Sequence, residues 1–188
     1  MIVKHLVFEC FISRAIIGRL YIYPNKIYPR EIAISLVFYG TINTVCNTIY
    51  MKYFLAKTEP GTYSIEDLER EGVTPWDGVH SYQAVNVIKS WNIGDKVFIY
   101  HSMGQARIVG LGTVVSNPNK DETDPRGISW FADIQYIRTY PEDQRVSLKQ
   151  VKESGLFGDF ALVRQSRLSV MECPQEFVDW LQEKGLKV

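Results

Sequence analysis

Residues 53–72, YFLAKTEPGTYSIEDLEREG, decide the fold because a buried strand, a corner and the start of a helix follow one another within this stretch. Apolar side chains occupy both alternating faces up to Ala56, which is typical of a central strand. Ser64 and Asp67 have the spacing of a capping box, in which each side chain accepts a hydrogen bond from the other residue's backbone. Gly72 then ends the helix. The stretch therefore predicts a strand that turns sharply into a short helix.

Beyond this corner, the apolar residues of the chain follow either the pattern of a strand or the spacing of a helix. β-rich runs separated by Gly, Pro, Asn and Asp occupy residues 95–102, 106–116, 129–140 and 167–173. Helical spacing is found at residues 81–91, 147–154 and 174–185. Because the strands cluster in the middle and the helices surround them, we expect an α+β fold with a barrel-like, mostly antiparallel sheet rather than a doubly wound one.

The first fifty residues differ from the rest of the chain. Residues 1–50 carry a net charge of 5 − 2 = +3, which leaves 16 − 19 = −3 for residues 51–188. No charge lies between Glu31 and Lys52, a distance close to a membrane span, but Ser, Thr and Asn side chains dilute this segment. Residues 1–50 therefore have three interpretations: a weak membrane anchor, a genuine extra element, or an upstream stretch that was included because translation was assigned to the wrong start. We favour the last interpretation, with a native start at Met51 and one domain over residues 51–188.

The composition limits the class of protein. A chain of 188 residues that is 46% hydrophobic can bury one sizeable core. Its three cysteines lie far apart without a C-x-x-C pair, which argues against a zinc ribbon or a disulfide framework. We therefore expect an intracellular protein, which is cytoplasmic or, in a eukaryote, nuclear. A mildly acidic body is not typical of a protein that binds phosphate backbones in general. We predict no cofactor, no metal and no membrane association.

Enzyme chemistry is not indicated by the sequence. Cys173 and His101 offer a Cys–His pairing, but Cys173 lies just before a helix, where an inert, partly buried thiol is the simpler interpretation. There is no G-x-S-x-G, and GLGTVV lies within a strand-like run that no helix follows. The carboxylates of residues 121–124 fit a solvated loop. A small hydrolase or transferase using His101, Cys173 or Glu59 stays open as an alternative.

Three segments place polar and aromatic residues at the ends of apolar elements, namely residues 57–60, 76–86 and 100–102. Aromatic faces stack on nucleobases, and amides, hydroxyls and carboxylates bind the edges of the base. Each segment alone also has a structural explanation. Trp76 fits a core position, and His101 fits a hydrogen-bonded ring at the end of a strand. A binding pocket requires that the three segments meet.

Several separated motifs occur in a specific order. They are KTEPGTYSIEDL at 57–68, WDGV at 76–79 with YQA-N at 82–86, GDKVFIYHS at 94–102, IVGLGTV at 108–114, DPR at 124–126 and LVRQSRLSV at 162–170. Their order resembles that of EVE domains, a family of the PUA-like superfamily. The resemblance covers essentially all of residues 51–188 and none of residues 1–50.

The resemblance implies a PUA-like pseudobarrel of mostly antiparallel strands surrounded by short helices. It also implies a non-catalytic module that recognises a modified base in DNA or RNA, in a pocket similar to that of YTH domains, which bind methylated adenine. Carried over by position, the pocket residues are Thr58, Glu59, Trp76, Val79, Tyr82, Gln83, His101 and Ser102. The residues expected to contact the nucleic-acid backbone are Lys57, Arg164 and Arg167.

One stretch departs from the family's pattern. The family commonly carries GVRNYQARN, whereas residues 78–86 are GVHSYQAVN. His80 and Val85 stand where that form has arginines, and each lost arginine removes a potential phosphate contact. A PUA-like RNA-binding protein that flips no base is therefore a second alternative.

Overall fold

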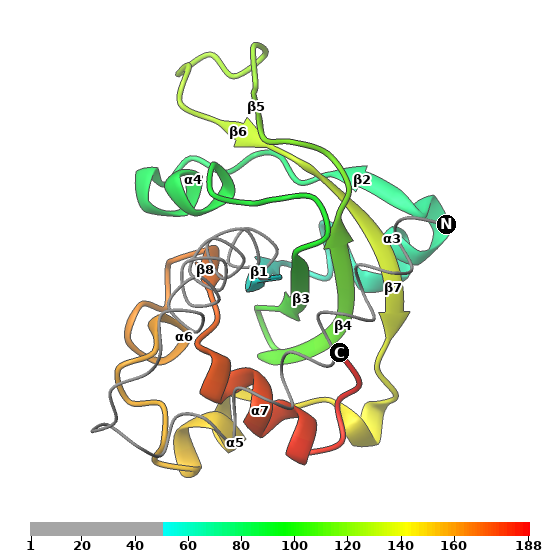
Figure 1. Ribbon diagram of the computed structural model, residues 1–188, viewed down its shortest axis with the longest axis vertical. Coiled ribbons are helices and arrows are strands. Elements are labelled where there is room, and N and C mark those ends of the chain that lie inside the picture. Colours follow the sequence, from blue (N-terminus) through cyan, green and yellow to red (C-terminus); the bar gives the residue numbers. More distant parts are fainter. Residues whose placement is uncertain (1–50) are drawn as a thin grey trace, which may run out of the picture. The chain divides into compact units, whose positions relative to one another are not determined.

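The structure, a computed structural model, describes residues 51–188 (Figure 1). The predictions for residues 1–50, including the start at Met51 and the weak anchor, lie outside the described residues and stay predictions. Among residues 51–188, no helix is both long and apolar enough to span a bilayer.

A six-stranded sheet with the order β2-β7-β4-β3-β1-β8 forms the centre of the domain (Figure 1). Its strands are β1 (Tyr53–Thr58), β2 (Val73–Pro75), β3 (Lys96–His101), β4 (Arg107–Val114), β7 (Asp133–Thr139) and β8 (Val170–Glu172). All neighbouring strands pair antiparallel except β1 and β3, which are parallel. The predicted α+β fold with a mostly antiparallel sheet is confirmed, and β1 has partners on both sides, as its apolar faces predict.

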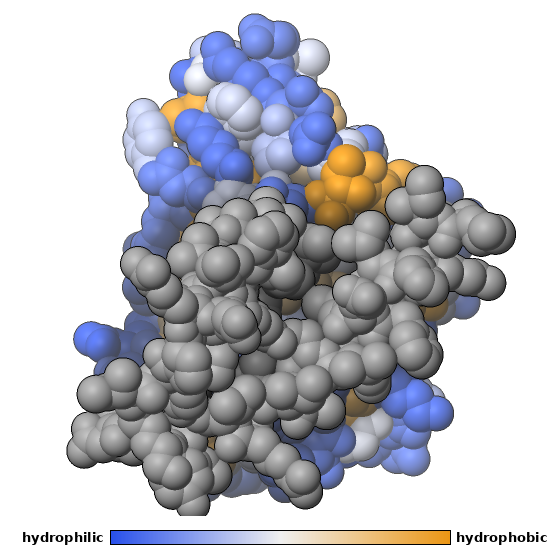
Figure 2. Space-filling view, in the orientation of Figure 1, coloured by the Kyte–Doolittle hydropathy of each residue, from blue (hydrophilic) through white to orange (hydrophobic). Residues whose placement is uncertain are grey.

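A two-stranded hairpin of β5 (Asn119–Lys120) and β6 (Trp130–Phe131) projects beyond the sheet. Figure 2 shows hydrophilic side chains covering its tip, at the top of the view. The sequence predicts one continuous strand over residues 129–140, which is wrong at Ala132. The carbonyl of Ala132 accepts from the backbone N–H of Trp76 at 3.0 Å, and the chain leaves the hairpin for the main sheet at this residue.

The short helices follow local rules. They are α3 (Ile65–Glu71), α4 (Tyr82–Ile88), α5 (Leu148–Glu153), α6 (Ala161–Arg164) and α7 (Gln175–Glu183), with one 3-10 turn at Glu142–Gln144. The capping box before α3 is confirmed: the Ser64 N–H donates to the Asp67 carboxylate at 2.8 Å, and the Asp67 N–H donates to Ser64 Oγ at 3.2 Å. Gly72 ends α3 with a φ of 76°. The predicted helix over residues 81–91 is shorter and ends at Ile88.

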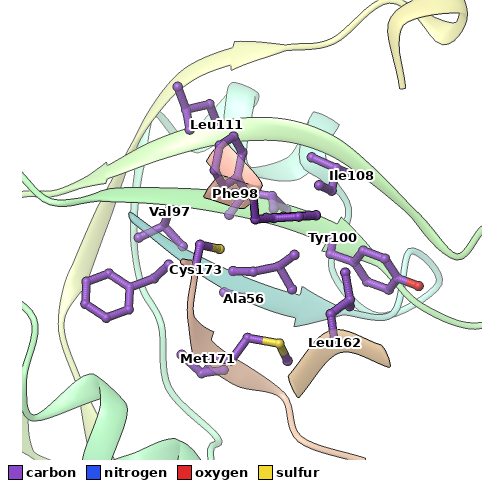
Figure 3. Packing of buried hydrophobic residues seen from close by; sticks show 14 of the residues in the cluster. Ala56, Val97, Phe98, Tyr100, Ile108, Leu111, Leu162, Met171 and Cys173 are labelled. Carbon is purple, nitrogen blue, oxygen red and sulfur yellow. The ribbon is translucent and has the colours of Figure 1, made fainter. Parts of the chain in front are cut away.

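The core is built around β1 and β3. Phe54, Leu55 and Ala56 on β1 have no exposed surface, which confirms that both faces of this strand are covered. Figure 3 shows Ala56, Val97 and further side chains of the two strands packed together. Strand β4 can pack closely because it carries glycines. A Cβ added to Gly110 would lie 2.5 Å from the Ile65 side chain, so GLGTVV serves packing and is not a phosphate loop.

Candidate nucleic-acid interface

Two of the predicted segments meet where β1 and β3 end. Because these strands are parallel, their carboxyl ends lie at the same edge of the sheet, and Thr58 stands opposite His101. The backbone N–H and the hydroxyl of Ser102 both donate to the Thr58 carbonyl, at 2.8 and 3.0 Å. Residues 57–60 and 100–102, more than forty positions apart in the chain, therefore form one local structure.

The corner after β1 is closed by its own hydrogen bonds. The Thr58 hydroxyl donates to the Tyr63 carbonyl at 2.8 Å. The Glu59 carbonyl accepts from the backbone N–H groups of Thr62 and Tyr63, both at 2.9 Å. Glu59 itself is exposed, so the turn presents its carboxylate to solvent.

His101 is buried and bonded at both ring nitrogens. Its Nε2 accepts from the backbone N–H of Ile65 at 3.0 Å, at the start of α3. Because this acceptor carries no proton, the Nδ1–H donates to Gln105 Oε1, 2.9 Å away. His101 thus joins the start of α3 to the turn after β3. Both of its ring nitrogens have partners within the domain, so neither is available to hydrogen-bond with a nucleobase.

The third segment, residues 76–86, divides into a buried part and an exposed part. Trp76 and Val79 are only 7% and 6% exposed and belong to the core. Tyr82, the first residue of α4, is 71% exposed, and Gln83 beside it is exposed too. The large aromatic surface available to a ligand in this segment is therefore that of Tyr82.

An open groove of about 330 Å³ lies between the start of α4 and the segment that leads into β8. Ser81 and Gln83 line one wall, and residues 164–168 line the other. The groove brings together three residues that the sequence predicts for the site: Gln83, Arg164 and Arg167. Of the two arginines, Arg164 donates to Asp159 Oδ1 at 3.0 Å on the surface.

Lys57 connects the sheet edge to this groove. Its Nζ donates to the carbonyl of Ser166 at 3.2 Å, and its backbone N–H donates to the Ser169 carbonyl at 2.7 Å. The ammonium group also lies 5.8 Å from the centre of the Tyr100 ring. Burial lowers the pKa of Lys57 and raises that of Tyr100. Lys57 is therefore a half-buried positive charge beneath the groove.

Cys173 does not have the surroundings of a nucleophile. The residue is buried, and Figure 3 shows its sulfur among the side chains of the core. Burial raises the pKa of the thiol well above its ordinary value, which disfavours the reactive thiolate. Within residues 51–188, no cluster of three or more His, Cys, Asp or Glu residues could hold a metal ion.

Sequence reasoning missed two structural features near the site. The Asp124 carboxylate is buried rather than solvated, and it accepts from the backbone N–H groups of Arg126, Ile128 and Ser129 at 2.8–3.0 Å. These donors lower its pKa and hold the hairpin tip in shape. The second feature is Gln105, which orients His101. The DPR motif, which begins with Asp124, is the signal that could have indicated the first, while no pattern in the sequence marked the second.

Comparison with known proteins gives the family. The EVE domain model matches residues 52–184 of this chain. The chain belongs to the EVE-domain family. The resemblance stated from the motifs is therefore confirmed, and the matched residues of this EVE domain include both walls of the groove and the β1–β3 edge.

Relatives of this EVE domain cover similar shares of the chain. Thymocyte nuclear protein 1 of Rattus norvegicus is 30% identical over an alignment 170 residues long, which covers 72% of this chain and 74% of the relative. The mouse protein is 31% identical over an alignment 164 residues long, which covers 69% and 71%. A structure of the human THYN1 protein in complex with DNA containing 5-methylcytosine is 25% identical, with a TM-score of 0.63, and covers 73% of this chain and 99% of that one. A protein from Agrobacterium tumefaciens is 34% identical, with a TM-score of 0.65, covering 72% and 94%.

Proposed function

We propose that this EVE domain is an intracellular module that binds nucleic acid and recognises a modified base in it, without catalysing a reaction. The DNA complex of the human relative makes 5-methylcytosine in DNA the first candidate. The observation that carries the proposal is the convergence at one edge of the sheet. There, Lys57 ties the Thr58 corner to the groove that holds Gln83, Arg164 and Arg167.

The residues divide by what they offer a ligand. Tyr82 offers a ring for stacking, and the Gln83 amide and the Glu59 carboxylate can hydrogen-bond to the edges of a base. Arg164 and Arg167 offer charges to phosphates. Trp76, Val79 and His101 are buried, so they contribute to the site through packing and hydrogen bonds within the domain. Lys57, Thr58 and Ser102 hold the edge together through the bonds described above.

The net charge of the domain indicates that its affinity for nucleic acid depends on contacts in the pocket. The domain has a net charge of −3, so it has no general attraction for the phosphate backbone, and affinity depends on local contacts. Extruding a base costs a few kcal/mol, and stacking on one aromatic side chain returns about 1–3 kcal/mol. The balance is close to zero for an ordinary paired base. A modification that adds contacts, or a base that is already unpaired, makes binding favourable.

The test is the affinity of the full chain for matched oligonucleotides, measured by fluorescence anisotropy. One pair of DNA duplexes differs only in 5-methylcytosine against cytosine, and a pair of RNA strands differs in N6-methyladenine against adenine. Tighter binding to a modified member supports the proposal and names the polymer. Equal affinity within both pairs contradicts it, and tight binding to plain structured RNA then favours the RNA-binding alternative.

The catalytic alternative has its own test. A hydrolase that used His101 would show turnover that disappears in His101→Ala. Because this histidine also braces the fold, the variant's thermal unfolding is measured alongside. Turnover in the wild-type protein on a modified oligonucleotide would contradict the proposed non-catalytic function.

A further inference from the structure

The turn between β3 and β4, residues 102–106, carries backbone strain. Met103 and Ala106 have φ values of 43° and 48°, and within residues 51–188 they are the two non-glycine residues with positive φ. Side chains with a Cβ disfavour this region, which is why glycine normally occupies it. Strained positions of this kind cluster at functional sites, where the surrounding structure holds them in place.

Three separate elements hold this turn. Ser102 is bonded to the Thr58 carbonyl at the end of β1. Gln105 is bonded to His101, whose ring is fixed in turn by the start of α3. The Ala106 carbonyl accepts from the backbone N–H of Leu148, at the start of α5, at 2.8 Å. The turn is therefore braced from β1, α3 and α5, and its unusual shape is specified by the fold.

This braced turn presents an apolar side chain to solvent. Met103 is 73% exposed, so the strain at this residue is not compensated by burial of its side chain. Met103 directly follows Ser102, which is bonded to Thr58. The neighbour of Thr58, Lys57, is bonded to Ser166 in the wall of the groove. Met103 thus projects from the same edge of the sheet as the proposed base site.

We propose that Met103 is a wedge that enters the base stack at the position left by the recognised base. Methionine is among the apolar side chains that proteins insert between base steps, and its unbranched, flexible chain adapts to an irregular gap. A side chain that acts as a wedge must project from rigid backbone. The hydrogen bonds from β1, α3 and α5 make the backbone of this turn rigid. This inference rests on the proposed function and adds to it that base recognition in a duplex requires Met103.

The test compares Met103→Ala with Ile93→Ala in the full chain. Ile93 is a matched control, because it is 61% exposed and lies before the amino end of β3, away from the site. The probes are a DNA duplex with one 5-methylcytosine followed by 2-aminopurine, and the methylated strand alone. Met103→Ala should weaken duplex binding about tenfold and reduce the rise in 2-aminopurine fluorescence. It should leave single-strand binding unchanged, because an unpaired base leaves no gap in a duplex.

A second variant separates the wedge from a structural role. Met103→Asn places a residue that tolerates positive φ at this position. The midpoint of its thermal unfolding should stay equal or rise, while its duplex affinity falls as in Met103→Ala. The proposal is overturned if Met103→Ala binds the duplex as Ile93→Ala does, or if it loses as much affinity for the single strand. A wild-type protein that prefers neither methylated DNA probe over its plain counterpart overturns the wedge proposal and 5-methylcytosine as the recognised base, whereas equal affinity for the RNA pair as well overturns the proposed function itself.

Discussion

Replacing Tyr82 with alanine separates an effect on binding from an effect on folding. The side chain is 71% exposed, so its removal takes little apolar surface out of the core. We expect the free energy of unfolding to change by less than about 0.5 kcal/mol, as at other surface positions. Trp76→Ala, by contrast, would remove a buried ring at a cost of about 3–5 kcal/mol, and its effect on binding would be confounded with unfolding.

The expected loss of binding follows from stacking. A base stacked on an aromatic side chain contributes about 1–3 kcal/mol, so Tyr82→Ala should weaken binding to methylated DNA by about 5- to 150-fold. Tyr82→Phe keeps the ring and should bind within about twofold of the wild type, if the ring rather than the hydroxyl makes the contact.

The assay is an anisotropy titration of labelled methylated DNA, with thermal unfolding of each variant. Leu156→Ala is the control, since Leu156 is 67% exposed and lies in the connection between α5 and α6. A folded Tyr82→Ala protein that binds as well as Leu156→Ala would refute the assignment of Tyr82 as the stacking surface.

The remaining predictions concern charge and packing. Arg164→Ala and Arg167→Ala should each make the slope of log K against log salt shallower by about 0.9 on duplex DNA, as loss of one phosphate contact requires. The Ser64 backbone N–H and the Arg70 side chain lower the pKa of Asp67 to about 2 from its ordinary 3.8, so the stability it contributes is present above pH 3.8 and is lost as the pH falls toward 2. Asp67→Asn should therefore have a flatter dependence of stability on pH between about 4 and 2. Gly110→Ala should lower the free energy of unfolding by about 1–3 kcal/mol, because its Cβ would clash with Ile65 and a backbone carbonyl.

Each of these predictions has a reference protein for comparison and a result that would contradict it. Lys149→Ala, an exposed charge on α5, should leave the salt slope unchanged; an equal change would show that only overall charge matters. If the acid-unfolding curves of Asp67→Asn and the wild type are parallel, Asp67 does not contribute to the loss of stability at low pH. Gly61→Ala, where an added Cβ meets nothing within 4 Å, is the control for Gly110→Ala, and equal stabilities would refute the packing argument.

The sequence predicted those parts of the fold that depend on neighbouring residues. The capping box at Ser64 was readable because its interaction spans three positions, and the strand before it because apolar residues occupy both of its alternating faces. The parallel pairing of β1 with β3 was not, since it depends on which strands meet in space. The break at Ala132 was missed for the same reason, because its bond to Trp76 joins residues 56 positions apart.

For the candidate site too, individual residues could be predicted from the sequence, whereas their arrangement in space could not. The family's motifs identified Tyr82, Gln83, Arg164 and Arg167 as site residues. Nothing in these motifs predicted the groove. That groove exists because the start of α4 lies beside the chain that enters β8. The burial of His101 was also unreadable, because its partner Ile65, 36 positions away, becomes a neighbour only in the folded chain.

Recognition of 5-methylcytosine in DNA is tested by a competition titration. Full-length protein is bound to a labelled DNA duplex with one 5-methylcytosine, and unlabelled duplexes with 5-methylcytosine or cytosine at that position compete for it. We expect the methylated competitor to displace the probe at a concentration at least about tenfold lower than the unmethylated one. Identical competition curves for the two duplexes, with the same result for the two single strands, would contradict it.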